Sequence, residues 1–389
     1  MKKFRWQLLI ILLTGLVVGI LLIFQQTSPT QRVVSTPSPV SGGIYTEALI
    51  GSFSRLNPML DHSNQPDRDV NRLLFNSLVR FDHRGLPYGD LAESWTYSED
   101  GTRYTFSLRP EVYWHDGQIL TADDILYTVG LLQSGSQLIP EDLRVFWPQV
   151  QVNALADDLV EFVLPEAFAP FLDYLSFQIL PSHLLGGLTL DELVDHPFNL
   201  APIGTGPYQF SELLVEDGVI SGVDLVAYVG YYQGQPFIDE IVFVYEPDET
   251  AAFAAYQAGE VDGISHISNE ILTDVLSQPG LNLYSVREPK LTTIFLNLNN
   301  PAKSFLQLPS VRKALMYATN RQNIISNLLM GQAVLAQGPV LPGNWAFFDT
   351  QDAYEYDPDK AQQLLASEGM RAGSAGTLQT AEGVELSLT

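Results

Sequence analysis

Apolar side chains alternate with polar ones in some stretches of the chain and recur every three or four residues in others. Such a pattern predicts a mixed α/β fold. Strands are expected where the side chains alternate, at residues 43–50, 104–108, 159–164, 241–245, 292–297 and 384–389. Helices are expected where the spacing is helical, at residues 67–82, 121–129, 248–259, 310–329 and 357–365.

Residues suited to helix ends mark several of these boundaries. Thr121 is a good N-cap, and Asp123 and Asp124 follow in the first turn, where the helix dipole favours negative charge. Gly259 is expected to end the Ala-rich helix before it, because glycine adopts the left-handed C-cap conformation without a steric penalty.

An uncharged apolar stretch, residues 8–24, follows three basic residues at the N-terminus. A helix of this length, at about 1.5 Å per residue, spans most of a hydrocarbon core of about 30 Å. Residues 1–26 are therefore predicted to be a membrane anchor or a signal segment, and the long apolar region favours the uncleaved anchor. Residues 27–41 are rich in Pro, Ser and Thr, which is typical of an extended linker. Because the basic flank stays in the cytoplasm, the remainder is expected at the cell surface or in the periplasm, anchored to the cytoplasmic membrane.

Composition narrows the possible functions. The 389 residues exceed one ordinary core, so two or three compact units are expected. A net charge of −25 repels phosphate backbones and argues against nucleic-acid binding. The absence of cysteine excludes disulfides and thiolate chemistry, and the six histidines lack the spacing of metal ligands. No nucleophile elbow or phosphate loop occurs, so no enzymatic activity, metal or cofactor is expected.

Nine short motifs follow one another in a fixed order along most of the chain. They are LAESW at 91–95, DG at 100–101, YTFSLR at 104–109, HDG at 115–117, TADD at 121–124, PIGTGPY at 202–208, GEVD at 259–262, VRKALMYATN at 311–320 and YDPDKAQQLL at 356–365. In this order they resemble the family 5 extracellular solute-binding proteins, the dipeptide-, oligopeptide- and nickel-binding receptors of ABC importers. The resemblance extends from residue 42 to the end of the sequence.

The resemblance implies a two-lobed α/β fold like that of the periplasmic binding proteins (class II, cluster C) with an extra subdomain. Its expected parts are residues 42–60 and 197–288 for the first lobe, 61–196 for the extra subdomain and 289–389 for part of the second lobe. Because relatives are usually longer, the second lobe is expected to be incomplete, as in a truncated or split receptor.

The resemblance also implies a function. A peptide or related small solute would be captured between two closing lobes and delivered to the permease subunits of an ABC importer. The receptor is expected to be a monomer that is held at the membrane by residues 8–24. The alternative is a membrane-anchored sensor or chaperone-like binding module without transport. Dipeptides, oligopeptides, nickel chelates and sugars all stay open as ligands.

Candidate ligand contacts come from the same resemblance. The loop after the first strand commonly faces the cleft in this family, and its residues are Phe53, Ser54, Arg55, Leu56 and Asn57. An ordinary packed turn is the alternative for this loop. Asn297 and Asn299 are expected near the crossing between the lobes, with hinge packing as the alternative. Trp345 is expected either to form an aromatic wall or to pack against its own lobe.

Overall fold

The computed structural model describes residues 40–288, 290–349, 354–372 and 377–380. The predicted anchor or signal segment, nearly all of the predicted linker and the strand expected at 384–389 lie outside these ranges. No helix within the described ranges is both long enough and apolar enough to cross a membrane.

A five-stranded sheet is assembled from segments that are far apart in the sequence. Its strands, in spatial order, are β11 (Gly263–Ile264), β1 (Ile44–Ile50), β10 (Glu240–Glu246), β9 (Val219–Ala227) and β8 (Tyr208–Glu216). Strand β1 runs parallel to both β10 and β11, whereas β10, β9 and β8 pair in antiparallel fashion. The expected strands at 43–50 and 241–245 are confirmed.

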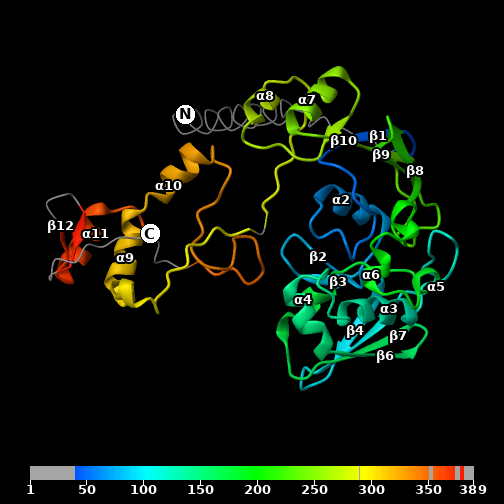
Figure 1. Cartoon of the computed structure of the whole chain (residues 1–389), viewed down its shortest axis with the longest axis horizontal. Helices are drawn as coiled ribbons and strands as arrows, with labels where there is room; N and C mark the ends of the chain where they lie inside the picture. The colour runs from blue at the N-terminus through cyan, green and yellow to red at the C-terminus, as the bar shows by residue number, and fades with distance from the viewer. Residues whose placement is uncertain (1–39, 289, 350–353, 373–376, 381–389) are drawn as a thin grey trace, which may run out of the picture. The chain divides into compact units, whose positions relative to one another are not determined.

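Alternation along β1 places neighbouring side chains on opposite faces of this sheet. Ala48 packs with Ala252 and Ala255 of α7 (Glu249–Ala258), which covers one face (Figure 1). Leu49 belongs instead to the large core of the molecule. Helix α7 ends as predicted at Gly259, which is left-handed with φ of 76°.

A second sheet has four antiparallel strands. In spatial order they are β4 (Ala92–Tyr97), β5 (Arg103–Leu108), β7 (Leu159–Val163) and β6 (Gln151–Ala156) (Figure 1). Helix α3 (Ala122–Gln133) packs against β6 and β7, and a group of fully buried aromatic rings fills the core beneath them. Those rings are Phe106, Trp147, Phe162 and Phe171. The strands expected at 104–108 and 159–164 and the helix beginning after Thr121 are confirmed.

Shorter elements connect these two sheets. They are α2 (Gln65–Leu74), β2 (Val79–Phe81), β3 (Pro87–Gly89), α4 (Glu141–Phe146), η1 (Trp147–Gln149), η2 (Ala169–Leu175), α5 (Ser182–Leu185), α6 (Leu190–Leu193), η3 (Pro197–Leu200) and α8 (Leu272–Leu276). The helix expected at 67–82 therefore ends early. Phe75 is extended, and the next two side chains, those of Asn76 and Ser77, form buried hydrogen bonds with partners outside the helix.

The later residues form a separate set of elements. They are η4 (Pro301–Gln307), α9 (Pro309–Ala318), α10 (Arg321–Asn323), η5 (Ile324–Leu328), α11 (Pro358–Ser367), β12 (Arg371–Ala372) and β13 (Leu378–Gln379). Helix α11 confirms the helix expected from 357 and packs against α9.

Two expectations in this region were wrong. The strand expected at 292–297 has no regular structure. The single helix expected at 310–329 breaks at Thr319, whose backbone is extended and whose hydroxyl bonds to the Leu315 carbonyl. Asn320 then caps α10 by accepting the Asn323 N–H, because short polar side chains offer the backbone an alternative to a continuous helix.

The Gly-Thr-Gly segment at 204–206 crosses α2 at very short range. Gly206 donates its N–H to the Leu74 carbonyl at 2.8 Å. A Cβ atom on Gly204 would lie 1.8 Å from that same carbonyl oxygen, and one on Gly206 would lie 2.1 Å from the Leu73 oxygen. Glycine is therefore required here for close approach of two backbones.

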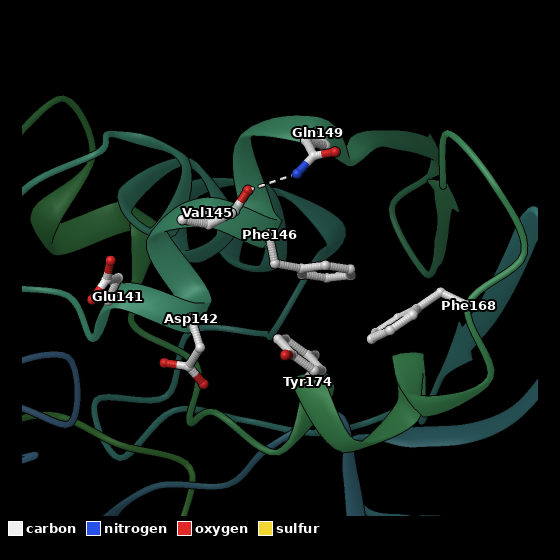
Figure 2. Close-up of a pocket in the computed structure, with 7 residues that line it drawn as sticks. All are labelled: Glu141, Asp142, Val145, Phe146, Gln149, Phe168 and Tyr174. Atoms are coloured by element: carbon white, nitrogen blue, oxygen red, sulfur yellow. Dashed lines mark hydrogen bonds between the residues drawn. The ribbon is translucent and has the colours of Figure 1, made fainter. Parts of the chain in front are cut away.

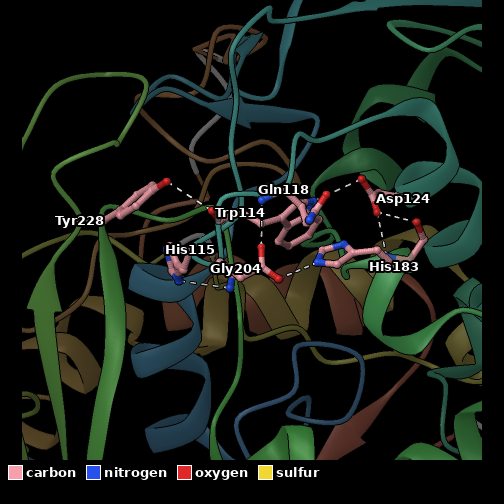
Figure 3. A network of polar contacts seen from close by, with 9 residues as sticks. Trp114, His115, Gln118, Asp124, His183, Gly204 and Tyr228 are labelled. Atoms are coloured by element: carbon pink, nitrogen blue, oxygen red, sulfur yellow. Dashed lines mark hydrogen bonds and ion pairs between the residues drawn. The ribbon is translucent and has the colours of Figure 1, made fainter.

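His115 bonds to both glycines and holds this crossing in place (Figure 3). Its Nδ1 accepts the Gly204 N–H at 3.2 Å, so Nε2 carries the proton and donates to the Gly206 carbonyl at 3.1 Å. The ring also packs edge-on against Tyr228, whose hydroxyl donates to the Trp114 carbonyl. Burial lowers the pKa of His115 to about 4.

Asp124 forms a neighbouring hub of the same network (Figure 3). Its carboxylate is 2% exposed and accepts the N–H of the N-cap Thr121 at 2.9 Å. Ser182 donates both its N–H and its hydroxyl to the other oxygen at 2.7 Å, and the Trp114 indole donates at 3.3 Å. One carboxylate thus joins the starts of α3 and α5 to the turn before α3.

We expect Gly204→Ala to lower the free energy of unfolding by at least about 3 kcal/mol, because the new methyl group would clash with backbone atoms of α2 that cannot move without disrupting the helix. Gly130→Ala is the matched control. Gly130 lies within α3 with open space around it, so alanine should stabilise the helix by up to about 1 kcal/mol. Urea denaturation of both variants checks this, and equal effects would contradict the close approach.

The low pKa of His115 predicts a pH dependence of stability. The folded pKa of about 4 lies below the unfolded value of about 6.5, so the stabilisation is complete above pH 6.5 and is lost as pH falls toward 4. The loss is at most about 3 kcal/mol. Asp61 has the opposite effect on the pH dependence of stability. Burial raises its pKa to about 6, so its protonation in acid stabilises the folded state.

Comparison of the parent chain with His115→Gln isolates the histidine contribution. The difference in unfolding free energy between the two should shrink steadily from pH 7 to pH 4, as measured by denaturant titrations at each pH. A difference that is constant across this range would show that His115 is not held neutral by the fold.

Candidate ligand-binding site

The carboxyl ends of three strands meet at one edge of the five-stranded sheet. Because β1 is parallel to β10 and β11, the loops that follow these strands leave the sheet on the same side. Gly51 donates its N–H to the Glu246 carbonyl at 2.8 Å, and Ser265 donates to the Ala48 carbonyl at 3.0 Å. Ligands of open α/β sheets bind outside such carboxyl ends, so this strand-end edge is the candidate site.

The buried carboxylate of Asp67 holds the loop after β1. It lies in the first turn of α2 and is 0% exposed. One oxygen accepts the Ser54 N–H at 3.2 Å, and the other accepts the Arg55 N–H at 2.9 Å and the Asn64 amide at 2.7 Å. Burial raises the pKa of Asp67, and these donors oppose the rise. The loop therefore has a fixed backbone before any ligand arrives.

Leu56 and Asn57 extend inward from the same loop. Both are 0% exposed. The Asn57 amide donates to the Asn199 side chain at 3.0 Å, and its oxygen accepts the Met59 N–H at 3.1 Å. In this structure both residues anchor the loop in the core and offer no free surface to a solute. Phe53, Ser54 and Arg55 keep part of their surface.

An aromatic pair lies beside the loop. The Phe53 and Tyr245 rings meet edge to face, with centroids 6.3 Å apart. Burial, with the nearby charge of Asp67 as a smaller cause, raises the pKa of the Tyr245 hydroxyl, so this group stays protonated. That hydroxyl is buried and has no hydrogen-bond partner among the described residues. A buried hydroxyl without a partner is costly, and like Asn57 this one offers no free surface to a solute in this structure.

The loop after β11 is held in a similar way to the loop after β1. Glu249, in the first turn of α7, accepts the Ser268 N–H at 3.1 Å and also the Ser268 hydroxyl. Its other oxygen bonds to Nδ1 of His266 at 2.8 Å. In both loops a carboxylate from the first helical turn fixes the backbone of a strand-end loop.

The remaining predicted site residues have no contact with the loop at 53–57 among the described residues. Asn297 and Asn299 are exposed, and the Asn297 side chain accepts the Asn299 N–H at 3.0 Å within a local turn. Trp345 is 61% exposed. No hydrogen bond, ion pair or ring contact among the described residues joins these three to the loop at 53–57. Their roles stay predictions.

A separate hollow of about 690 Å³ lies between α4 and η2 (Figure 2). It is lined by Glu141, Asp142, Val145, Phe146, Gln149, Phe168 and Tyr174. Phe146 contacts both other rings, with centroids 5.1 Å from Phe168 and 4.4 Å from Tyr174. The rings thus pack mainly against one another, and no element of the strand-end edge contributes to this hollow.

Sequence reasoning missed Asp67, Tyr245 and Glu249. Asp67 and Glu249 have a readable signal, since each is an acidic residue in a first helical turn that directly follows a strand and its loop. Tyr245 has none, because its position beside Phe53 depends on the pairing of β1 with β10. No cluster of His, Cys, Asp or Glu suited to a metal ion occurs within the described ranges.

We expect Asp67→Asn to cost about 2–4 kcal/mol of unfolding free energy, because an amide cannot accept all three donors and no longer carries the charge. Asp69→Asn, two residues away, removes an ion pair with the exposed Arg72 and leaves an amide oxygen that can still accept from the Gln65 side chain, so it should cost less than about 1 kcal/mol. Urea denaturation gives both values, and amide hydrogen exchange at Ser54 and Arg55 should accelerate only in Asp67→Asn. Similar behaviour of the two variants would refute the loop-fixing role of Asp67.

The chain matches known proteins over most of its length. The family described as bacterial extracellular solute-binding proteins, family 5 Middle, matches residues 87–389. The dipeptide-binding protein of Escherichia coli K12 is 30% identical over 359 residues, which is 86% of this chain and 65% of that protein. The chain thus spans less than two thirds of this relative.

Solved structures agree. NikZ from Campylobacter jejuni, in complex with Ni(L-His), superposes with a TM-score of 0.65 at 30% identity and covers 88% of this chain and 66% of NikZ. The oligopeptide-binding protein AppA from Bacillus subtilis, in complex with a nonapeptide, superposes with a TM-score of 0.62 at 26% identity, over 90% of this chain and 68% of AppA. The predicted fold class, that of two-lobed periplasmic binding proteins, is confirmed.

The family match, the order of the motifs and the strand-end edge agree, and the chain belongs to the family 5 bacterial extracellular solute-binding proteins.

Proposed function

We propose that the chain is the extracytoplasmic substrate-binding component of an ABC importer and captures a peptide or a related small solute. The observation that supports this most strongly is the strand-end edge of a family 5 protein, with loops fixed in advance by Asp67 and Glu249. Loops that are ordered before binding lose little conformational freedom when a solute arrives, which favours affinity. Such a site binds a solute without changing it chemically, so the proposed function is capture and not catalysis.

The division into lobes is part of this proposal. Residues 42–60 and 197–288 form the first lobe, 61–196 the extra subdomain and 289–389 part of the second lobe. All strands of the five-stranded sheet come from the first two ranges, and all strands of the four-stranded sheet come from the third. A solute is held between the first and second lobes, and hinge closure over it provides the signal to the permease.

The proposed setting follows from the N-terminal sequence and the charge. Residues 8–24 anchor the receptor to the outer face of the cytoplasmic membrane as a monomer, beside the permease subunits. The net charge of −25 keeps the exported part soluble and away from nucleic acids. Peptides are the first choice of ligand because the relatives include a dipeptide-binding protein and a structure holding a nonapeptide.

Thermal unfolding with a panel of short peptides tests the proposal. A ligand at 100 times its Kd stabilises the folded state by about 2.7 kcal/mol, so a peptide at micromolar to millimolar concentration should raise Tm by several degrees. Free amino acids, sugars and nickel chelates are the comparison ligands. If no member of the panel shifts Tm, capture of such solutes by this chain is refuted.

The neighbouring genes separate import from the alternative class of function. Permease and ATPase genes beside this gene are expected for an importer, whereas a sensor kinase gene would favour a sensor module. A chaperone-like module would bind unfolded proteins and would not discriminate among the short peptides of the panel.

A further inference from the structure

The guanidinium of Arg55 stands out at the strand-end edge. Arg55 is partly buried, and its side chain has no hydrogen bond or ion pair among the described residues. The two arginines of the adjacent helix are bonded: Arg68 donates to the Asp61 carbonyl at 3.1 Å and Arg72 pairs with Asp69 at 3.2 Å. A guanidinium carries five N–H donors that cannot be deprotonated. Arg55 therefore keeps its donors unused.

Nearby acid does not satisfy these donors. The charges of Asp67 and Arg55 interact, but both carboxylate oxygens of Asp67 already accept hydrogen bonds from the Ser54 and Arg55 N–H groups and the Asn64 amide. The whole chain carries 45 acidic side chains against 20 Lys and Arg, so an arginine without an acidic partner is unexpected unless a ligand supplies one. The fork of N–H groups on arginine matches a carboxylate in a bidentate pair.

The Phe53 ring supplies an apolar surface on the same loop. Phe53 keeps part of its surface, and the Tyr245 ring packs against it edge to face. Phe53 and Arg55 belong to one loop, whose backbone is fixed by the Asp67 carboxylate. A cation with free donors next to an apolar ring forms a suitable environment for a carboxylate attached to a short carbon chain.

We propose that Arg55 is a specificity-determining residue that binds a carboxylate of the solute. This inference rests on the proposed function and narrows it to solutes that carry a free carboxylate. The carboxylate belongs either to the C-terminus of a peptide or to an acidic side chain. Both sources present the same two oxygens to the guanidinium.

Binding of defined peptides tests the proposal, measured by calorimetry with the full chain. The probes are trialanine as the free acid and as the C-terminal amide, together with the amides of Ala-Glu-Ala and Ala-Gln-Ala. The first pair reports a C-terminal carboxylate and the second pair an acidic side chain. In at least one pair the carboxylate form should bind at least 10-fold more tightly, since bonds to charged groups are the stronger ones.

The variants are Arg55→Gln and Arg80→Gln. Arg80 lies in β2, is exposed and offers the same change of charge away from the edge. Arg55→Gln should weaken the carboxylate form at least 10-fold and change binding of its uncharged partner less than 2-fold, whereas Arg80→Gln should change neither. Arg55→Gln removes no hydrogen bond or ion pair, only the charge interaction with Asp67, so the ligand-free variant should lose little of the parent Tm.

Three outcomes overturn the assignment. If the members of each pair bind the parent chain equally, the solute carboxylate is not recognised. If Arg55→Gln and Arg80→Gln weaken the carboxylate form equally, the effect is one of net charge and not of a site. In both cases peptide capture itself stands. If none of the four probes binds the parent chain while other peptides raise its Tm, only this assignment fails, whereas failure of every peptide overturns the proposed function as well.

Discussion

Three buried carboxylates accept backbone N–H groups and thereby hold the loops on which the rest of the structure depends. Asp67 fixes the loop after β1, Asp124 joins the starts of α3 and α5, and Asp90 accepts the Ser77 N–H and the Asn76 amide. All three are at most 2% exposed. A buried charge is costly unless it is hydrogen-bonded, so each is stable only with its loops in place. This constraint gives the molecule defined turns without a disulfide.

The same interaction explains why the strand-end edge suits capture of a solute. Parallel pairing of β1 with β10 and β11 directs three chain segments to one edge, and carboxylates in the first turns of α2 and α7 fix two of the loops there. With the backbone already satisfied internally, a side chain such as that of Arg55 keeps free hydrogen-bonding groups. The hollow between α4 and η2 differs, because its aromatic rings are largely occupied with one another.

Much of the fold could be predicted from local pattern. The strands at β1, β5, β7 and β10 alternate cleanly, and α3, α7 and α11 begin or end at Thr121, Gly259 and Asp357 as their capping chemistry requires. The failures occur where polar side chains compete with the backbone. The helix expected at 310–329 breaks at Thr319 and Asn320, and the helix expected at 67–82 gives way to the buried bonds of Asn76 and Ser77. The spacing of apolar residues does not reveal such competition.

The sequence by itself determined the class of protein, the order of its elements and the loop at 53–57 as a place to look for the site. Local spacing, capping residues and motif order depend on residues that are close in the sequence, so they can be recognised without knowing the tertiary structure. Only the tertiary structure decided which residues of that loop stay available, because Asn57 meets Asn199 and Phe53 meets Tyr245 across long separations in the chain. Those contacts depend on strand pairing and burial, which no local pattern encodes.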